Sequence, residues 1–128
     1  MHIVYVSGVQ GESCWRVNYM KQRICALIGS SVNISCNYSY PTGHQLLEGY
    51  WFTTWESREE NPTKLTEVSH YEGRVEFSGQ TRNHHILTIK NLTESDSAEY
   101  KFRFHTNQKG GRYGGYPGVT LNVTGTVC

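Results

Sequence analysis

Long apolar segments are missing from this chain of 128 residues, and so is any excess of charge of one sign. No stretch of 18 apolar residues occurs, so no segment is expected to cross a membrane as a helix. Lysine and arginine number 12, against 11 aspartate and glutamate residues. This balance argues against a nucleic-acid-binding protein, because such proteins typically carry a basic excess.

Catalytic and metal-binding signatures are missing as well. The sequence contains no Cys-x-x-Cys pair, no phosphate-binding P-loop and no Gly-x-Ser-x-Gly motif. His84 and His85 are neighbours on a strand-like segment, so their side chains point to opposite faces and cannot hold one metal ion together. We therefore expect a protein that is not an enzyme and that needs no cofactor or metal.

Helical periodicity is the third absence, since no segment shows a 3.6-residue repeat over 11 residues. Short segments of aromatic, β-branched or alternating character occur instead, separated by glycine and proline. They cover residues 32–36, 50–55, 73–77, 85–89, 100–104 and 119–123. The pattern predicts a single all-β domain, an antiparallel sandwich or barrel, with a hairpin loop over the glycine-rich residues 110–118.

The beginning of the chain and its glycosylation sequons indicate an extracellular protein. Residues 1–11 are similar to the end of a secretory signal peptide, with cleavage after Gly11; an edge strand over 3–6 is the alternative. Sequons of the Asn-x-Ser/Thr type lie at Asn33, Asn37, Asn91 and Asn122. Four cysteines in a chain of this length fit an oxidising compartment.

A cysteine, a tryptophan and a tyrosine motif follow one another along the chain. Cys36 ends one predicted strand, Trp51 lies in the next, and an Asp-x-Ala-x-Tyr motif ends at Tyr100. These residues resemble the immunoglobulin sandwich, in which the tryptophan packs on the core and the tyrosine forms a corner. The resemblance implies a variable-type (V-set) domain over residues 12–125, an ion pair between Arg74 and Asp96, and extra strands before Arg74. Residues 126–128 would then start a linker or another domain.

Phe102 stands where a typical immunoglobulin domain has its second cysteine. The run from Asp96 to Arg103, with an aromatic residue in that place and an arginine directly after it, resembles the siglec family of sialic-acid-binding immunoglobulin-like lectins. Residues 15–124 carry the resemblance, and the runs 24–27 and 118–123 look like those of teleost B-cell-lectin-like members.

The resemblance implies that Arg103 binds the carboxylate of a terminal sialic acid. Strand alternation sends Tyr100, Phe102 and Phe104 inward and Lys101, Arg103 and His105 outward, and a guanidinium matches a carboxylate with two parallel hydrogen bonds. We expect the sugar to contact further residues of this face and of the first strand. These are Lys101, Tyr116, Gly118 and Trp15, with Tyr19 as the second candidate for the aromatic of the first strand.

The cysteines depart from the family pattern. Cys36 lacks the common partner, because Phe102 stands there, and the family partner, because His85 stands there. We expect Cys36 to be a buried free thiol. The resemblance implies a bond from Cys25 to a following domain, while the pairing of Cys14, Cys25, Cys36 and Cys128 stays open.

Two classes of function fit these observations. The first is a lectin on an immune cell that binds sialylated glycans of glycoproteins or glycolipids for adhesion or signalling. The second is an immunoglobulin-type receptor domain that binds a protein, or a second copy of itself, through the same GFCC′ sheet, and an outward Phe52 would favour it. Both place the chain in the ectodomain of a single-pass plasma-membrane receptor.

Overall fold

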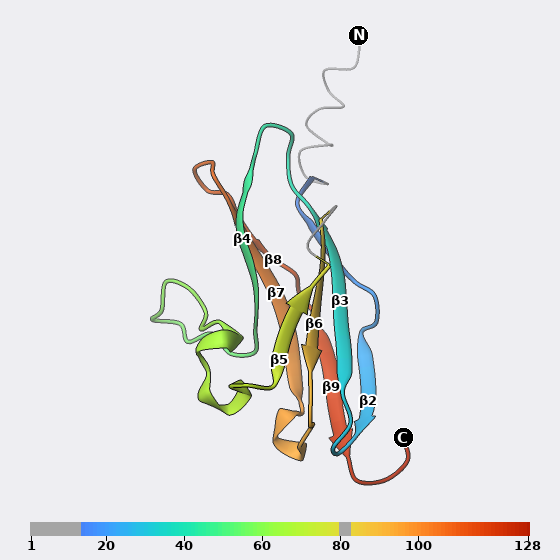
Figure 1. Ribbon diagram of the computed structural model, residues 1–128. Helices are drawn as coiled ribbons and strands as arrows, with labels where there is room; N and C mark the ends of the chain where they lie inside the picture. Colours follow the sequence, from blue (N-terminus) through green and yellow to red (C-terminus); the bar gives the residue numbers. More distant parts are fainter. Residues whose placement is uncertain (1–13, 80–82) are drawn as a thin grey trace.

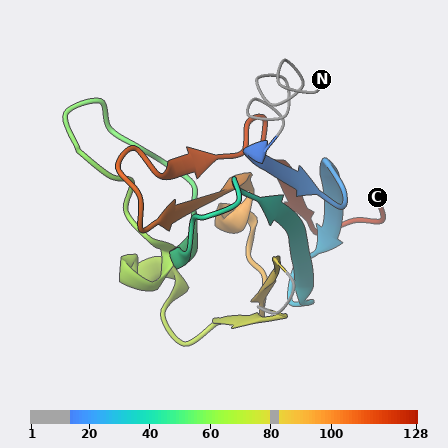
Figure 2. The ribbon, with the colours of Figure 1, turned by 90° about the horizontal axis from the view of Figure 1, so that it is seen from above.

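The computed structural model describes residues 14–79 and 83–128, which form two facing β-sheets (Figures 1 and 2). The segments proposed as a signal-peptide remnant or an edge strand, 1–11 and 3–6, lie outside the described residues. One sheet has the order β1 (Arg16–Tyr19), β3 (Val32–Ser39), β6 (His84–Ile89) and β5 (Val75–Ser78). The other has the order β2 (Arg23–Leu27), β9 (Val119–Thr124), β7 (Ala98–Thr106) and β4 (Leu46–Phe52), with β8 (Arg112–Gly114) also paired to β7.

All strand pairs are antiparallel except β2 and β9, which run parallel. Short 3-10 turns connect the strands: η1 (Leu65–Glu67), η2 (Ser69–Tyr71) and η3 (Glu94–Asp96). No helix among the described residues has the length and apolar character needed to span a bilayer. The prediction of an all-β antiparallel sandwich is confirmed, with one parallel pair at its edge.

Each predicted strand is present, but three details differ. Strand β4 begins at Leu46 and ends at Phe52, so residues 53–55 leave the sheet. The extra strands expected before Arg74 are not formed, because the chain there adopts the turns η1 and η2 instead. The predicted hairpin loop over 110–118 contains the short strand β8.

The core is filled by aromatic side chains in the alternation that the sequence predicts. Tyr100, Phe102 and Phe104 of β7 are fully buried, as is Trp51 of β4. The Phe102 ring lies 5.2 Å from the Trp51 ring and directly above Gly49. A Cβ atom at Gly49 would come within 2.5 Å of the Phe102 ring. The aromatic residue that replaces a cysteine therefore requires glycine on the neighbouring strand.

Asp96 organises the end of the sandwich at η3. Arg74 donates two hydrogen bonds to its carboxylate, each 2.8 Å long, so the expected ion pair is present. Burial alone would raise the pKa of Asp96, but the hydrogen bonds from Arg74 and from the Thr93 amide hold it below its usual value. The Tyr100 hydroxyl donates to the backbone carbonyl of Asp96 at 2.6 Å, which forms the expected tyrosine corner.

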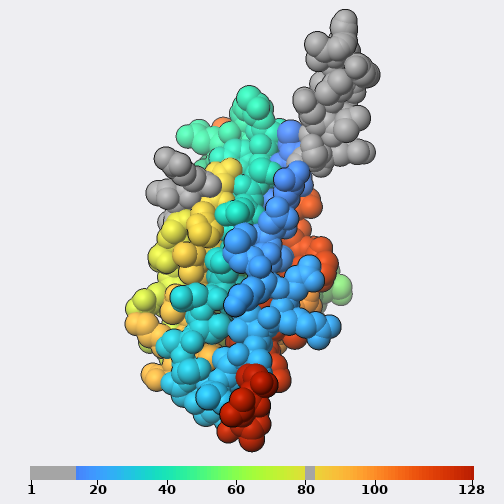
Figure 3. Space-filling model, turned by 90° about the vertical axis from the view of Figure 1, so that its right-hand side faces the viewer, coloured from blue at the N-terminus to red at the C-terminus, as the bar shows by residue number. Residues whose placement is uncertain are grey.

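The cysteines are partly as expected. Cys36 is buried without a disulfide partner, and burial raises the pKa of its thiol. It lies directly opposite His85 in the β3–β6 ladder. Cys25, however, forms a disulfide with Cys128, so the expectation that Cys25 bonds to a following domain is wrong. The bond ties the C-terminal end to β2. In Figure 3 the red C-terminal residues lie against the blue residues of the N-terminal part.

Trp51 donates its indole N–H to Nδ1 of His85 at 3.0 Å, which fixes the buried imidazole as a neutral acceptor. Burial lowers the pKa of His85 to about 4. The unfolded chain, with an ordinary histidine pKa near 6.5, takes up this proton first as the pH falls. The contribution of the neutral His85 to the free energy of unfolding is therefore complete above about pH 6.5 and is lost progressively as the pH falls toward 4.

We expect the free energy of unfolding to fall by about 2–3 kcal/mol between pH 7 and pH 4.5 through His85 alone. Urea denaturation across this pH range measures it, with His85→Gln as the control, because glutamine can accept from Trp51 without titrating. The difference between the two pH profiles isolates His85. Parallel profiles for the two proteins would contradict a neutral buried imidazole.

Gly49→Ala should destabilise the domain by about 1–3 kcal/mol, because the added methyl group overlaps the Phe102 ring. Gly125→Ala is the matched control, since its added Cβ finds only an ordinary contact at 3.6 Å. Urea denaturation measures the free energy of unfolding of both variants. Phe102→Leu should lower this free energy less in the Gly49→Ala background than in the wild type, because the smaller side chain relieves the overlap. Additive effects of the two substitutions would argue against the clash.

Candidate functional site

The outward face of the β4–β7 sheet is covered rather than open. Tyr50 and Phe52 of β4 lie opposite Arg103 and Lys101 of β7, and alternation points all four side chains away from the core. Tyr50 is nevertheless only 6% exposed, Phe52 0% and Arg103 8%. The connection that follows β4, residues 53–64, folds back over them. The outward Phe52 therefore offers no apolar patch for a partner.

Arg103 is held by its neighbours on this covered face. Its guanidinium lies 4.3 Å from the centre of the Trp55 ring, a cation–π contact of the kind that contributes about 0.5–2 kcal/mol. Nη2 donates to the Asn61 side-chain oxygen at 3.3 Å, and Nε donates to Nε2 of His105 at 3.3 Å. Arg103 thus lies on the expected outward face, where Trp55 and Asn61 cover its guanidinium.

His105 completes this arrangement as a neutral acceptor. Burial, and then the positive charge of Arg103, lower its pKa below the ordinary histidine value. Glu48 lies 3.7 Å from the other ring nitrogen and also accepts a hydrogen bond from Lys64 at 2.8 Å. The guanidinium of Arg103 therefore faces no carboxylate among these close partners, and an anionic ligand would meet an uncompensated positive charge.

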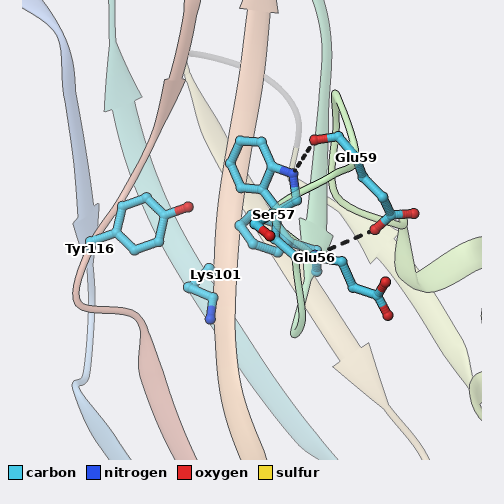
Figure 4. A pocket seen from close by; sticks show the side chains of 7 residues that line it. Glu56, Ser57, Glu59, Lys101 and Tyr116 are labelled. Carbon is cyan, nitrogen blue, oxygen red and sulfur yellow. Dashed lines mark hydrogen bonds between the residues drawn. The ribbon is translucent and has the colours of Figure 1, made fainter.

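A cleft of about 380 Å³ lies on this face. Arg103 is not among its lining residues, but its guanidinium packs on the ring of Trp55, which lines the cleft. Tyr116 lies on one side, Glu56 and Glu59 lie on the other, and Lys101 lies between them (Figure 4). Trp55 belongs to the acidic side, because its indole N–H donates to the Glu59 carbonyl at 3.1 Å. The cleft is lined by Phe52, Trp55, Glu56, Ser57, Glu59, Lys101 and Tyr116.

Exposed aromatic surface and polar groups of both charges meet in this cleft. Tyr116 is 60% exposed and Trp55 38%. Lys101 packs over the Phe52 ring, with 5.5 Å between its Nζ and the ring centre, and donates to the Thr53 carbonyl at 3.1 Å. A pyranose can stack on such rings while carboxylate, ammonium and hydroxyl groups bond to its substituents.

Tyr116 lies in the connection between β8 and β9, and the pairing around it differs from the prediction. Arg103 faces Gly114 rather than the region 116–119, because two extra residues between β8 and β9 break the register. Gly118 is packed instead of open, since a Cβ there would lie 2.3 Å from the Tyr100 carbonyl oxygen. Its N–H donates to the Glu99 carboxylate at 2.7 Å. Gly118 therefore offers no backbone for a sugar to approach.

The aromatic residues of the first strand serve the core rather than the site. Trp15 stacks on Phe104 and Tyr113, with ring centres 5.9 and 6.0 Å away, and it is absent from the cleft lining. The Tyr19 hydroxyl accepts from the Phe102 amide at 2.8 Å and donates to the Gly115 carbonyl at 2.9 Å. Tyr19 thus joins β1 to β7 and to the chain after β8.

Of the predicted sugar contacts, the structure brings together Lys101 and Tyr116 in the cleft, with Arg103 beside it. Sequence reasoning missed Trp55 and Asn61, and it missed the covered Tyr50. The run of aromatics from Tyr50 to Trp55 was the available signal, because alternation already directs Tyr50 and Phe52 outward. The asparagines of the four sequons, for which glycosylation stays a prediction, are all exposed.

Comparison with known proteins identifies the family. The model of the immunoglobulin V-set domain matches residues 22–124. This chain belongs to the immunoglobulin V-set family. The structure of murine CRIg is similar to this V-set domain, with a TM-score of 0.62 and 17% sequence identity over 84% of this chain and 98% of the other. At this identity the likeness concerns the fold alone.

Membership narrows the function to recognition outside the cell. V-set domains are generally receptor and binding domains without catalytic activity, and the Cys25–Cys128 disulfide fits an extracellular environment. Residues 14–79 and 83–128 contain no group of three or more His, Cys, Asp or Glu side chains that could hold a metal ion. The β4–β7 face, which carries Arg103 and the cleft, is the candidate binding surface.

Phenylglyoxal should modify Arg103 more slowly than the exposed Arg112 of β8, because Trp55 and Asn61 cover its guanidinium. Trp55→Ala should raise the rate at Arg103 severalfold, and Tyr116→Ala, which alters the cleft without uncovering Arg103, should not. Peptide mapping by mass spectrometry measures the rates. Equal rates at Arg103 and Arg112 in the unmodified sequence would contradict the covered arrangement.

Proposed function

We propose that this V-set domain is a lectin of the cell surface that binds terminal sialic acid of glycoproteins or glycolipids. One observation carries the proposal: two of the residues that the siglec resemblance selects, Lys101 and Tyr116, line one cleft with Trp55, and the Trp55 ring rests on the third, Arg103. The cleft thus adjoins the arginine that the resemblance assigns to the carboxylate.

Each part of the site suits one part of the sugar. The rings of Tyr116 and Trp55 offer apolar faces to the pyranose and its glycerol chain, while Ser57 and Glu59 offer hydrogen bonds to its hydroxyl groups. A carboxylate bound by Arg103 would gain charge-assisted hydrogen bonds, each contributing about 1.5–3 kcal/mol when it is shielded from water.

Binding by one domain should be weak, because a monosaccharide offers few atoms and part of the gain is spent in uncovering Arg103. Many copies on a membrane, engaging many glycans on another cell, would raise the overall avidity without new contacts. This is consistent with a role in adhesion or signalling at immune-cell surfaces, as the ectodomain of a single-pass receptor.

Recognition of a protein through the same face is the second candidate. It is favoured by the covered state of Arg103 and by the exposed Leu47 of β4. A protein ligand, or a second copy of the domain, could contact Leu47 while Arg103 stays closed. Removal of sialic acid would leave such binding intact.

Sialidase treatment of cells should abolish the binding of a multivalent form of this domain. Arg103→Ala should reduce the binding of untreated cells by about tenfold or more, because it removes both carboxylate hydrogen bonds. Arg103→Lys should retain only part of the binding, since an ammonium group cannot form the two parallel hydrogen bonds that a guanidinium makes to a carboxylate. Flow cytometry measures binding, and Arg112→Ala is the matched control on the neighbouring strand.

The same measurement separates the two candidates. Binding that persists after sialidase, and is unchanged in Arg103→Ala, would reject the lectin and favour protein recognition.

A further inference from the structure

The hydroxyl of Tyr50 is the one buried side-chain polar atom without a hydrogen-bond partner among the described residues. Tyr50 is only 6% exposed, and it lies directly opposite Arg103 in the β4–β7 ladder. Burying a hydroxyl without a partner is unfavourable by about 1–3 kcal/mol. An unsatisfied donor on the cross-strand neighbour of Arg103 therefore points to an acceptor that binds there in another state of the protein.

The hydrogen bond that Arg103 already makes indicates where that acceptor would lie. The guanidinium already holds a side-chain oxygen, because Nη2 donates to Oδ1 of Asn61 at 3.3 Å. An amide oxygen is a neutral acceptor with the same geometry as one oxygen of a carboxylate. Asn61 therefore occupies the position of a ligand oxygen, and the Trp55 ring packs on the same guanidinium.

The surroundings of Tyr50 favour an anion. The Lys64 ammonium lies 5.3 Å from the centre of the Tyr50 ring, and Arg103 is its cross-strand neighbour. The carboxylate of Glu48 is already engaged by Lys64 at 2.8 Å. Burial, opposed in part by Arg103, raises the pKa of Tyr50, so its hydroxyl keeps the proton that it would donate.

We propose that Tyr50 is a second donor to the ligand carboxylate and that Asn61 is an internal substitute for it. In the closed state Asn61 accepts a hydrogen bond from Arg103, and the Trp55 ring packs on the guanidinium. In the bound state the carboxylate replaces Asn61 on Arg103, with one of its oxygens accepting from the Tyr50 hydroxyl, and residues 53–64 move aside. This inference rests on the proposed lectin function and adds to it a specificity-determining residue and an internal competitor.

The two roles predict opposite effects of substitution. Tyr50→Phe removes only the hydroxyl and should weaken binding about five- to tenfold, as expected for one hydrogen bond to a charged group. Asn61→Ala removes the competitor and should strengthen binding severalfold. A merely structural role for either residue would not produce this pair of opposite changes, because loss of packing would weaken binding in both variants.

The experiment is an NMR titration of the isotope-labelled domain with the methyl α-glycoside of N-acetylneuraminic acid. The indole N–H of Trp55 and the guanidinium Nε–H of Arg103 are the reporters. Tyr113→Phe, which removes an exposed hydroxyl on β8, is the control for Tyr50→Phe, and Arg103→Ala is the control for the proposed function. Amide spectra establish that each variant is folded.

The outcomes separate the two proposals. Weaker binding by Tyr50→Phe together with tighter binding by Asn61→Ala supports the inference, including the case in which saturable binding is detected only after Asn61→Ala. Binding that needs Arg103 but is unchanged in both variants overturns the inference and leaves the lectin function standing. Failure of every variant to bind the glycoside, or binding that persists in Arg103→Ala, overturns the proposed function and the inference with it.

Discussion

The rest of this structure depends on the contact between Phe102 and Gly49. An immunoglobulin sandwich usually joins its sheets with a disulfide at this place, and here the ring of Phe102 fills the space instead. It fits because Gly49 has no side chain on the neighbouring strand and because Trp51 and Tyr38 pack against the ring at 5.2 Å. The sheets are thus held by buried aromatic surface, which is non-directional, rather than by a covalent bond.

The loss of this disulfide leaves two side chains that need another arrangement. Cys36 becomes a small buried apolar residue, a state in which free cysteine is common. His85, opposite Cys36, accepts from Trp51 and so fixes the orientation of the large indole in the core. A hydrogen bond between side chains thereby supplies some of the specificity that a covalent link would give. It also makes the core sensitive to acid, because the bond requires a neutral imidazole.

The features that follow from strand alternation could be predicted from the sequence, and those that depend on irregular backbone could not. Alternation placed Tyr100, Phe102 and Phe104 in the core, and the resemblance to the immunoglobulin sandwich implied the ion pair between Arg74 and Asp96. The two extra residues between β8 and β9 carry no periodic signal, so the partner of Arg103 was predicted wrongly. The Cys25–Cys128 bond was equally hidden, because cysteine spacing alone does not determine pairing.

The same limit applies to the candidate site, where the decisive residues lie on the connection after β4. Tyr50 and Phe52 point outward by alternation, and two large aromatic rings on a sheet face are unfavourable in water. The polar segment 53–64 has no pattern that predicts its path, yet it must cover those rings. It does so with Trp55 against Phe52 and Lys64 over Tyr50. Covering the rings also covers Arg103, the cross-strand neighbour of Tyr50. The need to bury apolar surface therefore determines how accessible the arginine is, and any ligand of Arg103 has to compete with the folding of this segment.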